Sequence, residues 1–203
     1  MGVKERRARE GTARLDAILA AAESVFARDG YQLARMEDIA ETAELAKGTL
    51  YYYFKSKDEI FARLLERESG KVLDEVRRRI PEPSTFREAL EQTVLFYLEY
   101  FEANQGFLKM VLPSMCGFIR FGDADIVRRS TKGFDAHAAF VRKALRTRLR
   151  REKLPFDAGD LQMFLKTLQL GIGLSILDGR RDEARAAARF FLDLAKRVME
   201  NRS

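Results

Sequence analysis

The sequence is poor in the residues that most catalytic and metal sites require. It holds one histidine and one cysteine, His137 and Cys116, in 203 residues. A lone cysteine cannot form an internal disulfide, so we expect a reducing compartment, the cytoplasm. Cys116 with His137 is the only conceivable nucleophile–base pair, and no helical spacing ties the two together. We therefore predict no catalytic residue, no metal and no cofactor, and a protein that is not an enzyme.

Three further absences narrow the fold class. Proline occurs 4 times and glycine 13 times, which is few turn-forming residues for a β-sandwich. No run approaches the roughly 20 apolar residues of a membrane-spanning helix, so we predict no membrane partner. The first ten residues are charged and lack the apolar segment of a secretory signal. With 46% apolar and 33% charged residues, the composition is that of a globular protein.

The charge balance alone says little about a nucleic-acid partner. The chain has 37 basic and 31 acidic residues, for a formal net charge of +6. Residues 1–60, however, hold 10 Lys or Arg against 11 Asp or Glu. A nucleic-acid interface must therefore be inferred from the local arrangement of charges and not from the total.

Apolar residues recur at helical spacing along almost the whole chain. This periodicity predicts about nine helices and no strand, so the fold class is all-α. Gly30 marks one helix end, and Pro81 and Pro83 mark another. Ser56 with Glu59 and Thr85 with Glu88 have the spacing of capping boxes, and Asp157 is a cap by itself. Gln105-Gly106 should interrupt the pattern, and Pro113 should kink or divide the helix that follows.

The most informative segment runs from Met36 to Lys57. Two short helices, 36–43 and 47–53, are separated by about three residues, which is the spacing of a helix-turn-helix. In the second helix Leu50 and Phe54 face the core, so Lys47, Thr49, Tyr51 and Tyr52 are left on the outside. Exposed tyrosines can bond a phosphate or pack on a thymine methyl. A solvated helix with surface tyrosines is the alternative reading of this helix alone.

The segment as a whole resembles the TetR family of bacterial transcriptional repressors over about residues 12–65. The matching residues are Ala21-Ala22, Val25-Phe26, Gly30-Tyr31, Asp38-Ile39-Ala40, Ala43, the run from Lys47 to Phe54, Ser56-Lys57 and Glu59. The resemblance implies three parts, namely a helix-turn-helix domain over 1–56, a connecting helix over 57–80, and an effector-binding and dimerisation domain over 81–203. It also implies double-stranded operator DNA and a second copy of the chain as partners.

Carried over residue by residue, the resemblance assigns DNA contacts to the second helix and to the start of the connecting helix. These residues are Lys47, Gly48, Thr49, Tyr51, Tyr52, Tyr53 and Lys57, the last of them on a phosphate. The chain departs from the family at Glu44, where a turn often needs positive φ, and at Ala46, which cannot cap a helix. Arg35 replaces a Ser/Thr cap, and it either reaches a phosphate or is solvated.

Two basic runs lie outside this segment. The N-terminal arm, with Lys4, Arg6, Arg7, Arg9 and Arg14, either follows the DNA backbone and enters a minor groove or is a disordered tail. The run from Arg142 to Lys153 ends a long helix, where cations suit the helix dipole. We interpret the second run as a solvated face, with an acidic partner as the alternative.

The second half of the chain is rich in aromatic residues and Met, which suits a hydrophobic ligand. Each such residue alone is more often core than pocket. The predicted pocket residues are Phe96, Tyr97, Tyr100, Phe107, Met110, Phe118, Phe134 and Phe164. The two last helices each carry an apolar stripe, either for a four-helix dimer interface or for burial within one subunit. The predicted interface residues are Leu161, Leu168, Ile172, Phe191, Leu194 and Val198.

The sequence therefore predicts a ligand-responsive DNA-binding regulator, a repressor released from a palindromic operator by a hydrophobic small molecule. An architectural DNA-binding protein would not need so large an apolar second half. A helical adaptor that binds only proteins would not explain the run from Lys47 to Lys57.

Overall fold

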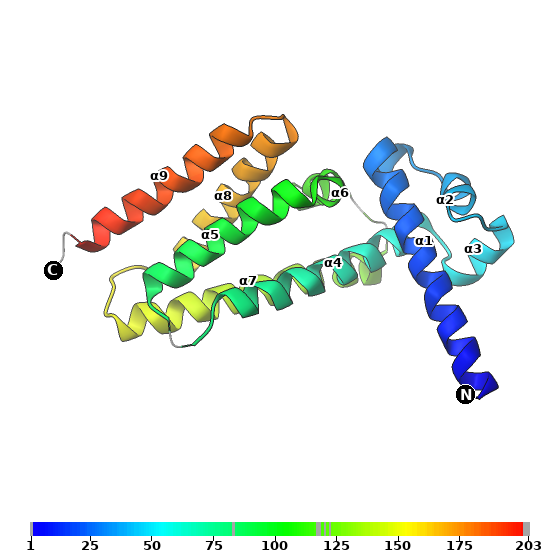
Figure 1. The fold of residues 1–203 in the computed structure, drawn as a ribbon, viewed down its shortest axis with the longest axis horizontal. Helices are drawn as coiled ribbons and strands as arrows, with labels where there is room; N and C mark the ends of the chain where they lie inside the picture. The colour runs from blue at the N-terminus through cyan, green and yellow to red at the C-terminus, as the bar shows by residue number, and fades with distance from the viewer. Residues whose placement is uncertain (1, 83, 117–118, 120, 122, 201–203) are drawn as a thin grey trace. The chain divides into compact units, whose positions relative to one another are not determined.

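The computed structural model describes every residue except 1, 83, 117–118, 120, 122 and 201–203. The described residues form nine α-helices and no strand, which confirms the all-α prediction (Figure 1). None of these helices is both long and apolar enough to cross a membrane. The helices are α1 (Val3–Leu33), α2 (Met36–Thr42), α3 (Lys47–Tyr53), α4 (Lys57–Arg79), α5 (Phe86–Ala103), α6 (Gln105–Met115), α7 (Ala124–Arg151), α8 (Ala158–Leu177) and α9 (Arg181–Glu200).

The contacts divide the chain into two compact units. Unit 1 comprises residues 1–68 and 109–132, and unit 2 comprises residues 69–108 and 133–203. Three helices, α4, α6 and α7, thus begin in one unit and end in the other. The limits at residues 56 and 80 that the sequence suggested are functional ones, and they stay a prediction.

The core of unit 1 lies where α1 meets α2, α3 and the first turns of α4. Its largest members expose 1% or less of their surface, and they are Ile18, Phe26, Ile39, Leu50, Ile60, Phe61, Leu64 and Leu65. Gly30 does not end α1, as the sequence suggested, but kinks it. With φ 75° and ψ 160°, Gly30 turns the chain, and the helix continues to Leu33. Only glycine takes such a conformation easily, because it has no Cβ.

Side chains begin several helices as the sequence predicted. Thr85 accepts a hydrogen bond from the Glu88 amide and the Glu88 carboxylate accepts one from the Thr85 amide, which is a full capping box. At α4 the box is shifted, because the Glu59 carboxylate accepts from Lys55 rather than from Ser56. The helical pattern is interrupted close to the predicted place, because α5 ends at Ala103 with Asn104 as its C-cap. Helix α6 begins directly afterwards, at Gln105 and not at Phe107, and holds Pro113 inside its span.

In unit 2, helices α5, α8 and α9 pack against one another (Figure 1). The second part of α4 meets α7 at a small-residue contact. A Cβ placed on Gly133 of α7 would lie 1.8 Å from Oγ and 2.6 Å from Cβ of Ser69 in α4. The two helices therefore approach to a distance that only glycine permits at this point.

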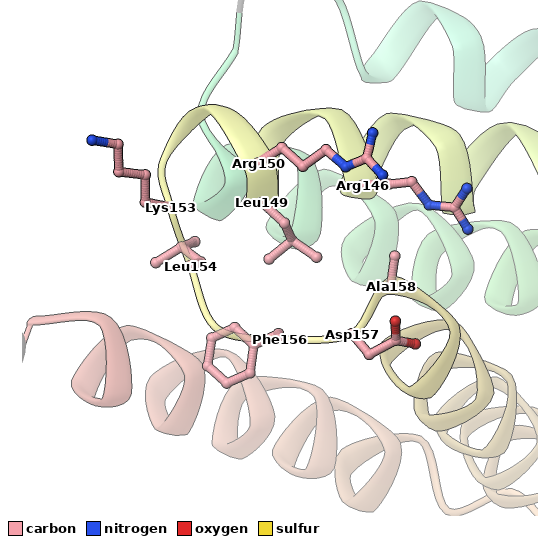
Figure 2. A pocket seen from close by; sticks show the side chains of 8 residues that line it. All are labelled: Arg146, Leu149, Arg150, Lys153, Leu154, Phe156, Asp157 and Ala158. Atoms are coloured by element: carbon pink, nitrogen blue, oxygen red, sulfur yellow. The ribbon is translucent and has the colours of Figure 1, made fainter.

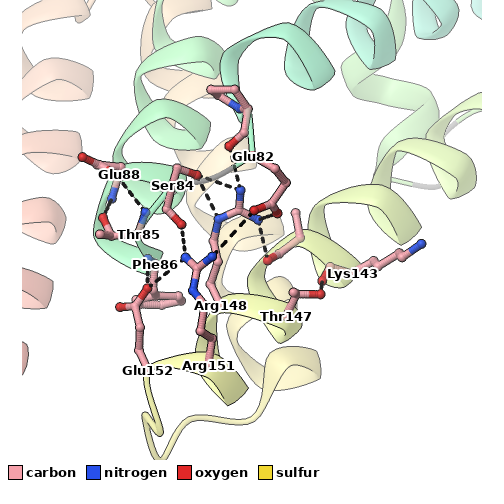
Figure 3. A network of polar contacts seen from close by, with 12 residues as sticks. Glu82, Ser84, Thr85, Phe86, Glu88, Lys143, Thr147, Arg148, Arg151 and Glu152 are labelled. Carbon is pink, nitrogen blue, oxygen red and sulfur yellow. Dashed lines mark hydrogen bonds and ion pairs between the residues drawn. The ribbon is translucent and has the colours of Figure 1, made fainter.

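A buried arginine anchors the connection between α4 and α5 (Figure 3). Arg148 of α7 exposes 1% of its surface. Its guanidinium donates to Ser84 Oγ and to the carbonyls of Pro81 and Ala144 at 2.7–3.0 Å, and it pairs with the Glu82 carboxylate at 2.9 Å. The interpretation of the whole run from Arg142 to Lys153 as a solvated face was thus wrong for Arg148. Except for Ala144, its partners lie more than 60 residues away in the sequence.

Candidate nucleic-acid interface

Helices α2 and α3 pack against each other through a turn that depends on an unusual backbone at Glu44. Glu44 has φ 54°, as the sequence predicted from its place in the turn. The Glu44 amide donates to the Glu41 carbonyl (3.0 Å) and the Leu45 amide to the Ala40 carbonyl (2.9 Å). This is the pair of bonds that closes a helix with a left-handed residue, a position that glycine usually fills. The turn therefore sets the direction of α3 at some conformational cost.

The N-termini of both short helices lack a side-chain cap. Ala46 precedes α3 and its side chain cannot accept a hydrogen bond, as predicted. Arg35 precedes α2, and its amide donates to the Asp38 carboxylate at 3.3 Å. The Arg35 guanidinium is exposed and lies 3.9 Å from the Glu37 carboxylate. Both roles suggested for Arg35 stay open.

Helix α3 presents an aromatic surface on a buried support. Leu50 and Phe54 are buried, whereas Tyr52 exposes 79% of its surface and Tyr51 is also exposed. Tyr53 is half-buried and its ring meets that of Tyr52 edge-on. Around Gly48 there is open space where a Cβ would stand, so another backbone can approach closely. These positions agree with the assignment of Tyr51, Tyr52 and Gly48 to DNA contact, which stays a prediction.

Lys47 and Thr49 are less accessible for DNA contact than the exposed tyrosines. The Lys47 ammonium pairs with the Glu37 carboxylate and lies 5.9 Å from the centroid of the Tyr51 ring. Glu37 raises the pKa of Lys47, chiefly through their hydrogen bond, and Lys47 lowers the pKa of Glu37 in return. Thr49 is half-buried. A phosphate contact by Lys47 therefore requires exchange of Glu37 for the phosphate.

Lys57 holds α4 against the end of α1. Its ammonium donates to the carbonyls of Tyr31 (2.9 Å), Gln32 (3.0 Å) and Ala34 (3.2 Å). These three bonds use every N–H of the group. The resemblance assigned Lys57 to a phosphate, and that contact would require the ammonium to leave carbonyls at the C-terminal end of α1.

Tyr31 is the residue of this region whose importance the sequence did not reveal. Its ring lies 4.8–5.9 Å from those of Phe26, Phe61 and Phe121. Its hydroxyl donates to the Asp58 carboxylate. Burial raises the pKa of Tyr31, and the bond to Asp58 raises it further, so the phenol stays neutral. In the sequence, only the position of Tyr31 directly after Gly30 drew attention to it. That position did not indicate its contacts with Asp58 and Phe121.

Two contacts join the second segment of unit 1 to α4. The Phe121 ring lies 5.8 Å from that of Phe61. Arg129 of α7 donates to Glu66 at 3.0 Å, and Arg63 holds the same carboxylate at 3.1 Å. Burial opposes ionisation of Glu66, but these two bonds prevail and lower its pKa. Phe121 and Arg129 are thus held against the helix that follows the predicted DNA-reading segment.

The N-terminal arm is helical. Helix α1 begins at Val3, and Arg6 pairs with Glu10 at 3.4 Å on an exposed face. A disordered tail is therefore not what the structure shows. A regular helix keeps the basic residues of the arm at fixed spacing, ahead of the helix-turn-helix.

Of the predicted effector residues, four form one aromatic cluster in unit 2. Phe96, Tyr97 and Phe107 are buried and Tyr100 is half-buried. Ring centroids in the cluster are 5.2 Å apart for Phe96 and Tyr97, 5.4 Å for Phe96 and Tyr100, and 6.2 Å for Tyr100 and Phe107. The structure thus brings α5 and the start of α6 together as expected.

The other four predicted pocket residues are not part of this cluster. Met110 is buried but belongs to unit 1. Phe134 is half-buried on α7. Phe164 exposes 50% of its surface and packs on Phe191 of α9 at 5.0 Å between ring centroids, away from this cluster, and its role in a pocket stays a prediction. Phe118 lies outside the described residues.

A polar pair joins the aromatic cluster. The Tyr97 hydroxyl hydrogen-bonds His137 Nε2, and the two rings meet edge-on with centroids 5.6 Å apart. Burial lowers the pKa of His137 to about 4 and raises that of Tyr97. Both groups are therefore neutral at pH 7. The sequence left His137 as a surface or core residue, and the structure has it half-buried against the buried Tyr97.

The last two helices leave an apolar surface uncovered in the single chain. Of the predicted interface residues, Leu194 and Val198 are exposed, and Leu161, Leu168 and Phe191 are half-buried. Ile172 exposes only 2% of its surface in the single chain, so it is covered there already, and its place in an interface stays a prediction. The sequence missed Met163 (67% exposed), Leu174 and Phe190 (70%). Helix α8 is apolar on most sides, so periodicity could not separate its inner from its outer face.

The N-terminal part of the chain matches a known family. Residues 18–64 match the model of the bacterial regulatory proteins of the tetR family. The fatty acid metabolism regulator protein of Bacillus subtilis is 36% identical over 73 residues, which are 36% of this chain and 38% of that protein. The transcriptional regulator QacR of Staphylococcus aureus is 28% identical over 106 residues, 44% and 56% of the two chains. The chain thus spans about two fifths and somewhat more than half of the length of these two regulators.

Solved structures match over most of the chain. The transcriptional regulator FadR from Bacillus subtilis, solved in complex with stearoyl-CoA, has a TM-score of 0.74. The match has 18% identity and covers 88% of this chain and 95% of that one. A transcriptional regulator from Saccharomonospora viridis, solved in complex with choline, has a TM-score of 0.69 at 23% identity, covering 90% and 96%. At these identities the likeness shows the fold of both units.

Proposed function

This chain belongs to the TetR family of bacterial regulatory proteins, and on that premise we propose that it represses transcription from a palindromic operator in the bacterial cytoplasm. The observation that carries the proposal is the exposed face of α3. Tyr52 points outward from a helix whose opposite side, Leu50 and Phe54, is buried in unit 1. A solvated helix without a partner would not need aromatic residues on that face.

We assign α3 to the major groove of the operator. Tyr51 and Tyr52 supply hydroxyls for phosphates and ring edges for thymine methyl groups. The open space at Gly48 allows the DNA backbone to approach α3 closely. Lys47 pairs with Glu37 in the free protein, and on DNA a phosphate takes the place of the Glu37 carboxylate. The Lys47 ammonium therefore has an anionic partner both with and without DNA.

A hydrophobic small molecule is the effector that we propose. Phe96, Tyr97 and Phe107 supply an aromatic wall, and the neutral Tyr97–His137 pair supplies a polar contact for the ligand's head. A regulator with a similar fold has been solved with stearoyl-CoA, a long acyl chain on a polar carrier, and another with choline. Phe134 lies on α7 three residues before His137 and completes this set.

Ligand binding reaches the DNA-reading segment through α6 and α7. Both helices have one end in each unit, and in unit 1 Phe121 and Arg129 contact α4. A shift of these residues moves α4, and with it the bond between Lys57 and the end of α1. A coupling of about 1–3 kcal/mol would weaken DNA binding 5- to 150-fold.

The apolar surface of α8 and α9 fits a second copy of the chain. Phe190, Leu194 and Val198 are four residues apart on α9 and share one face. Burying this face in a two-fold dimer removes a patch of apolar surface that a monomer would leave in water. A dimer also presents two copies of α3 to the two halves of a palindrome.

The test is DNA binding to the region that flanks the protein's own gene. Fluorescence anisotropy with the full chain should show a saturable complex at one palindrome, and footprinting should locate it. Tyr52→Ala should weaken that complex by 1–3 kcal/mol, the range for a lost base contact, while Lys166→Ala on exposed α8 should leave it unchanged. Equal affinity of wild type and Tyr52→Ala for the palindrome would contradict the proposed docking.

A further inference from the structure

The basic run at the end of α7 is divided between two faces of the helix. Arg148 and Arg151 turn toward Glu82 and Ser84, which hold them by ion pairs and hydrogen bonds (Figure 3). Arg142, Arg146 and Arg150 follow one another at four-residue spacing on a different, exposed face. In the described part of the chain, no carboxylate forms an ion pair with these three arginines or with Lys153. Salt bridges within the chain therefore pair the arginines on one face of α7 only, the face of Arg148 and Arg151.

The unpaired cations adjoin a pocket of about 340 Å³ between the end of α7 and the start of α8. Arg146, Arg150 and Lys153 line it together with an apolar group, Leu149, Leu154, Phe156 and Ala158. Figure 2 shows Leu149 pointing from α7 toward the loop that carries Leu154 and Phe156, with Lys153 extending from the end of the helix. A volume of this size is at the lower end of the range for small-molecule sites.

The backbone at Lys153 is a second observation at the same place. Lys153 has φ 53°, and the bonds Lys153 amide to Arg150 carbonyl and Leu154 amide to Leu149 carbonyl close α7. The same closure ends α8, where the left-handed residue is Gly179. Glycine is the usual residue at this position because a Cβ is strained there. At the end of α7 a strained lysine stands in its place, and its side chain lines the pocket.

The Asp157 carboxylate also lines the pocket, but it already accepts hydrogen bonds from the backbone. Asp157 caps α8 by accepting from the amides of Gly159 (2.7 Å) and Asp160 (3.1 Å). These backbone bonds, with a smaller contribution from Arg146, lower the pKa of Asp157. Its charge is opposed by the N-terminus of α8, so the balance at the pocket stays positive.

We propose that this pocket binds a phosphorylated small molecule that carries an apolar group. Arg146, Arg150 and Lys153 would hold the phosphate oxygens by charge-assisted hydrogen bonds. Leu149 and Leu154 would contact the apolar group, together with the open side of Phe156, whose ring stacks on Phe86 at 6.4 Å. A concave site with an apolar floor favours a small molecule over a DNA duplex or a membrane, which would need a flat or convex basic surface. The proposal is independent of operator binding.

Calorimetry on the full chain can test this with three probes, hexyl diphosphate, inorganic pyrophosphate and hexanol. We expect saturable binding of hexyl diphosphate, weaker binding of pyrophosphate, and none of hexanol. The double variant Arg146→Ala, Arg150→Ala should lower the affinity for hexyl diphosphate by about tenfold or more, as expected when charge-assisted bonds are lost. Lys166→Ala, which removes an exposed cation elsewhere on α8, should leave the affinity unchanged.

The variant Lys153→Gly distinguishes a role of Lys153 in ligand binding from a role in the stability of the fold. Relief of the left-handed strain should raise the melting temperature, while loss of the ammonium should weaken hexyl diphosphate binding. A purely structural role for Lys153 would move only the melting temperature. The proposal would be overturned by equal affinities in the double variant and Lys166→Ala. Arginine-dependent binding to phosphatidylglycerol vesicles or to DNA, without binding of hexyl diphosphate, would overturn it as well.

Discussion

The ammonium of Lys57 lies 4.8 Å from the centroid of the Tyr31 ring and donates to the Tyr31 carbonyl at 2.9 Å. One side chain at the start of α4 thus contacts both the backbone and the ring of a residue at the end of α1. In turn, the Tyr31 hydroxyl donates a hydrogen bond to the carboxylate of Asp58, the next residue of α4. The orientation of the helix-turn-helix on α4 depends on this reciprocal pair of contacts.

Replacing Lys57 with Met should therefore destabilise the fold. Three carbonyls at the end of α1 lose a charged donor, and bonds to charged groups contribute about 1.5–3 kcal/mol each before relaxation and replacement by water. We expect a net loss of about 1–3 kcal/mol in the free energy of unfolding, measured by urea titration. An unchanged unfolding free energy, with only a weaker salt dependence of DNA binding, would instead assign Lys57 to a phosphate.

The stability of the protein should depend on pH through its single histidine. Burial lowers the pKa of His137 to about 4, from 6.5 in the unfolded chain. Between these values the unfolded state binds the extra proton, so the stability is fully present above pH 6.5 and falls as the pH drops toward 4. The shift corresponds to about 3 kcal/mol at most, less with partial exposure to water. His137→Gln should flatten the difference in stability between pH 7 and pH 4.5, and an unchanged profile would show that His137 titrates normally in the fold.

Contact between α4 and α7 predicts that Gly133→Ala is destabilising. The added Cβ would lie 2.6 Å from the Ser69 Cβ, so the helices must separate, and overpacking of this kind costs about 1–3 kcal/mol. Ser69→Gly in the same chain should restore part of the loss, which a double-mutant cycle by thermal unfolding would measure. Gly171→Ala is the matched control, because nothing lies within 4 Å of its Cβ position. That control should stabilise α8 by about 0.5–1 kcal/mol.

The turn before α3 offers a stabilising change. Glu44 has φ 54°, and a non-glycine residue in this region carries a cost of about 1–2 kcal/mol. Glu44→Gly should recover most of it, since the backbone bonds that close α2 remain. Glu41→Gly in the last turn of α2 is the opposing control, because glycine inside a helix is unfavourable by about 1 kcal/mol. A lower melting temperature for Glu44→Gly would mean that its carboxylate stabilises the turn in another way.

Local signals in the sequence predicted local structure well. Thr85 and Asp157 cap the helices that they were expected to cap, because the bonds involve residues two or three positions away. Positive φ at Glu44 was expected from the resemblance to the TetR family, where a turn often needs positive φ at this position. Leu50 and Phe54 were assigned to the core from their spacing alone, and Tyr52 was left outside, as the structure has them.

Contacts between segments distant in the sequence could not be predicted from these local signals. Arg148 lies in a run of cations, and nothing local distinguishes it from Arg146, yet one is buried against residues 81–84 and the other lines a pocket. Phe121 contacts Tyr31 across 90 residues. The exposure of Phe164 and the burial of Ile172 could not be predicted, because α8 is apolar on most sides and only the packing against other helices decides which face is covered.

The apolar face of α9 predicts a dimer that a single charge can break. Leu194 is nearly half exposed, between Phe190 and Val198 on the same face. Leu194→Glu would bury a carboxylate against its own copy across a two-fold axis, which costs several kcal/mol unless a partner is supplied. Sedimentation at micromolar concentration should show a dimer for the wild type and a monomer for this variant. Because two copies of α3 must reach successive major grooves, about 34 Å apart, the monomer should also lose most of its affinity for the palindrome. Glu200→Lys, a charge reversal near the end of α9, is the control and should stay dimeric. A wild-type monomer with full operator affinity would contradict both the interface and the two-fold mode of binding.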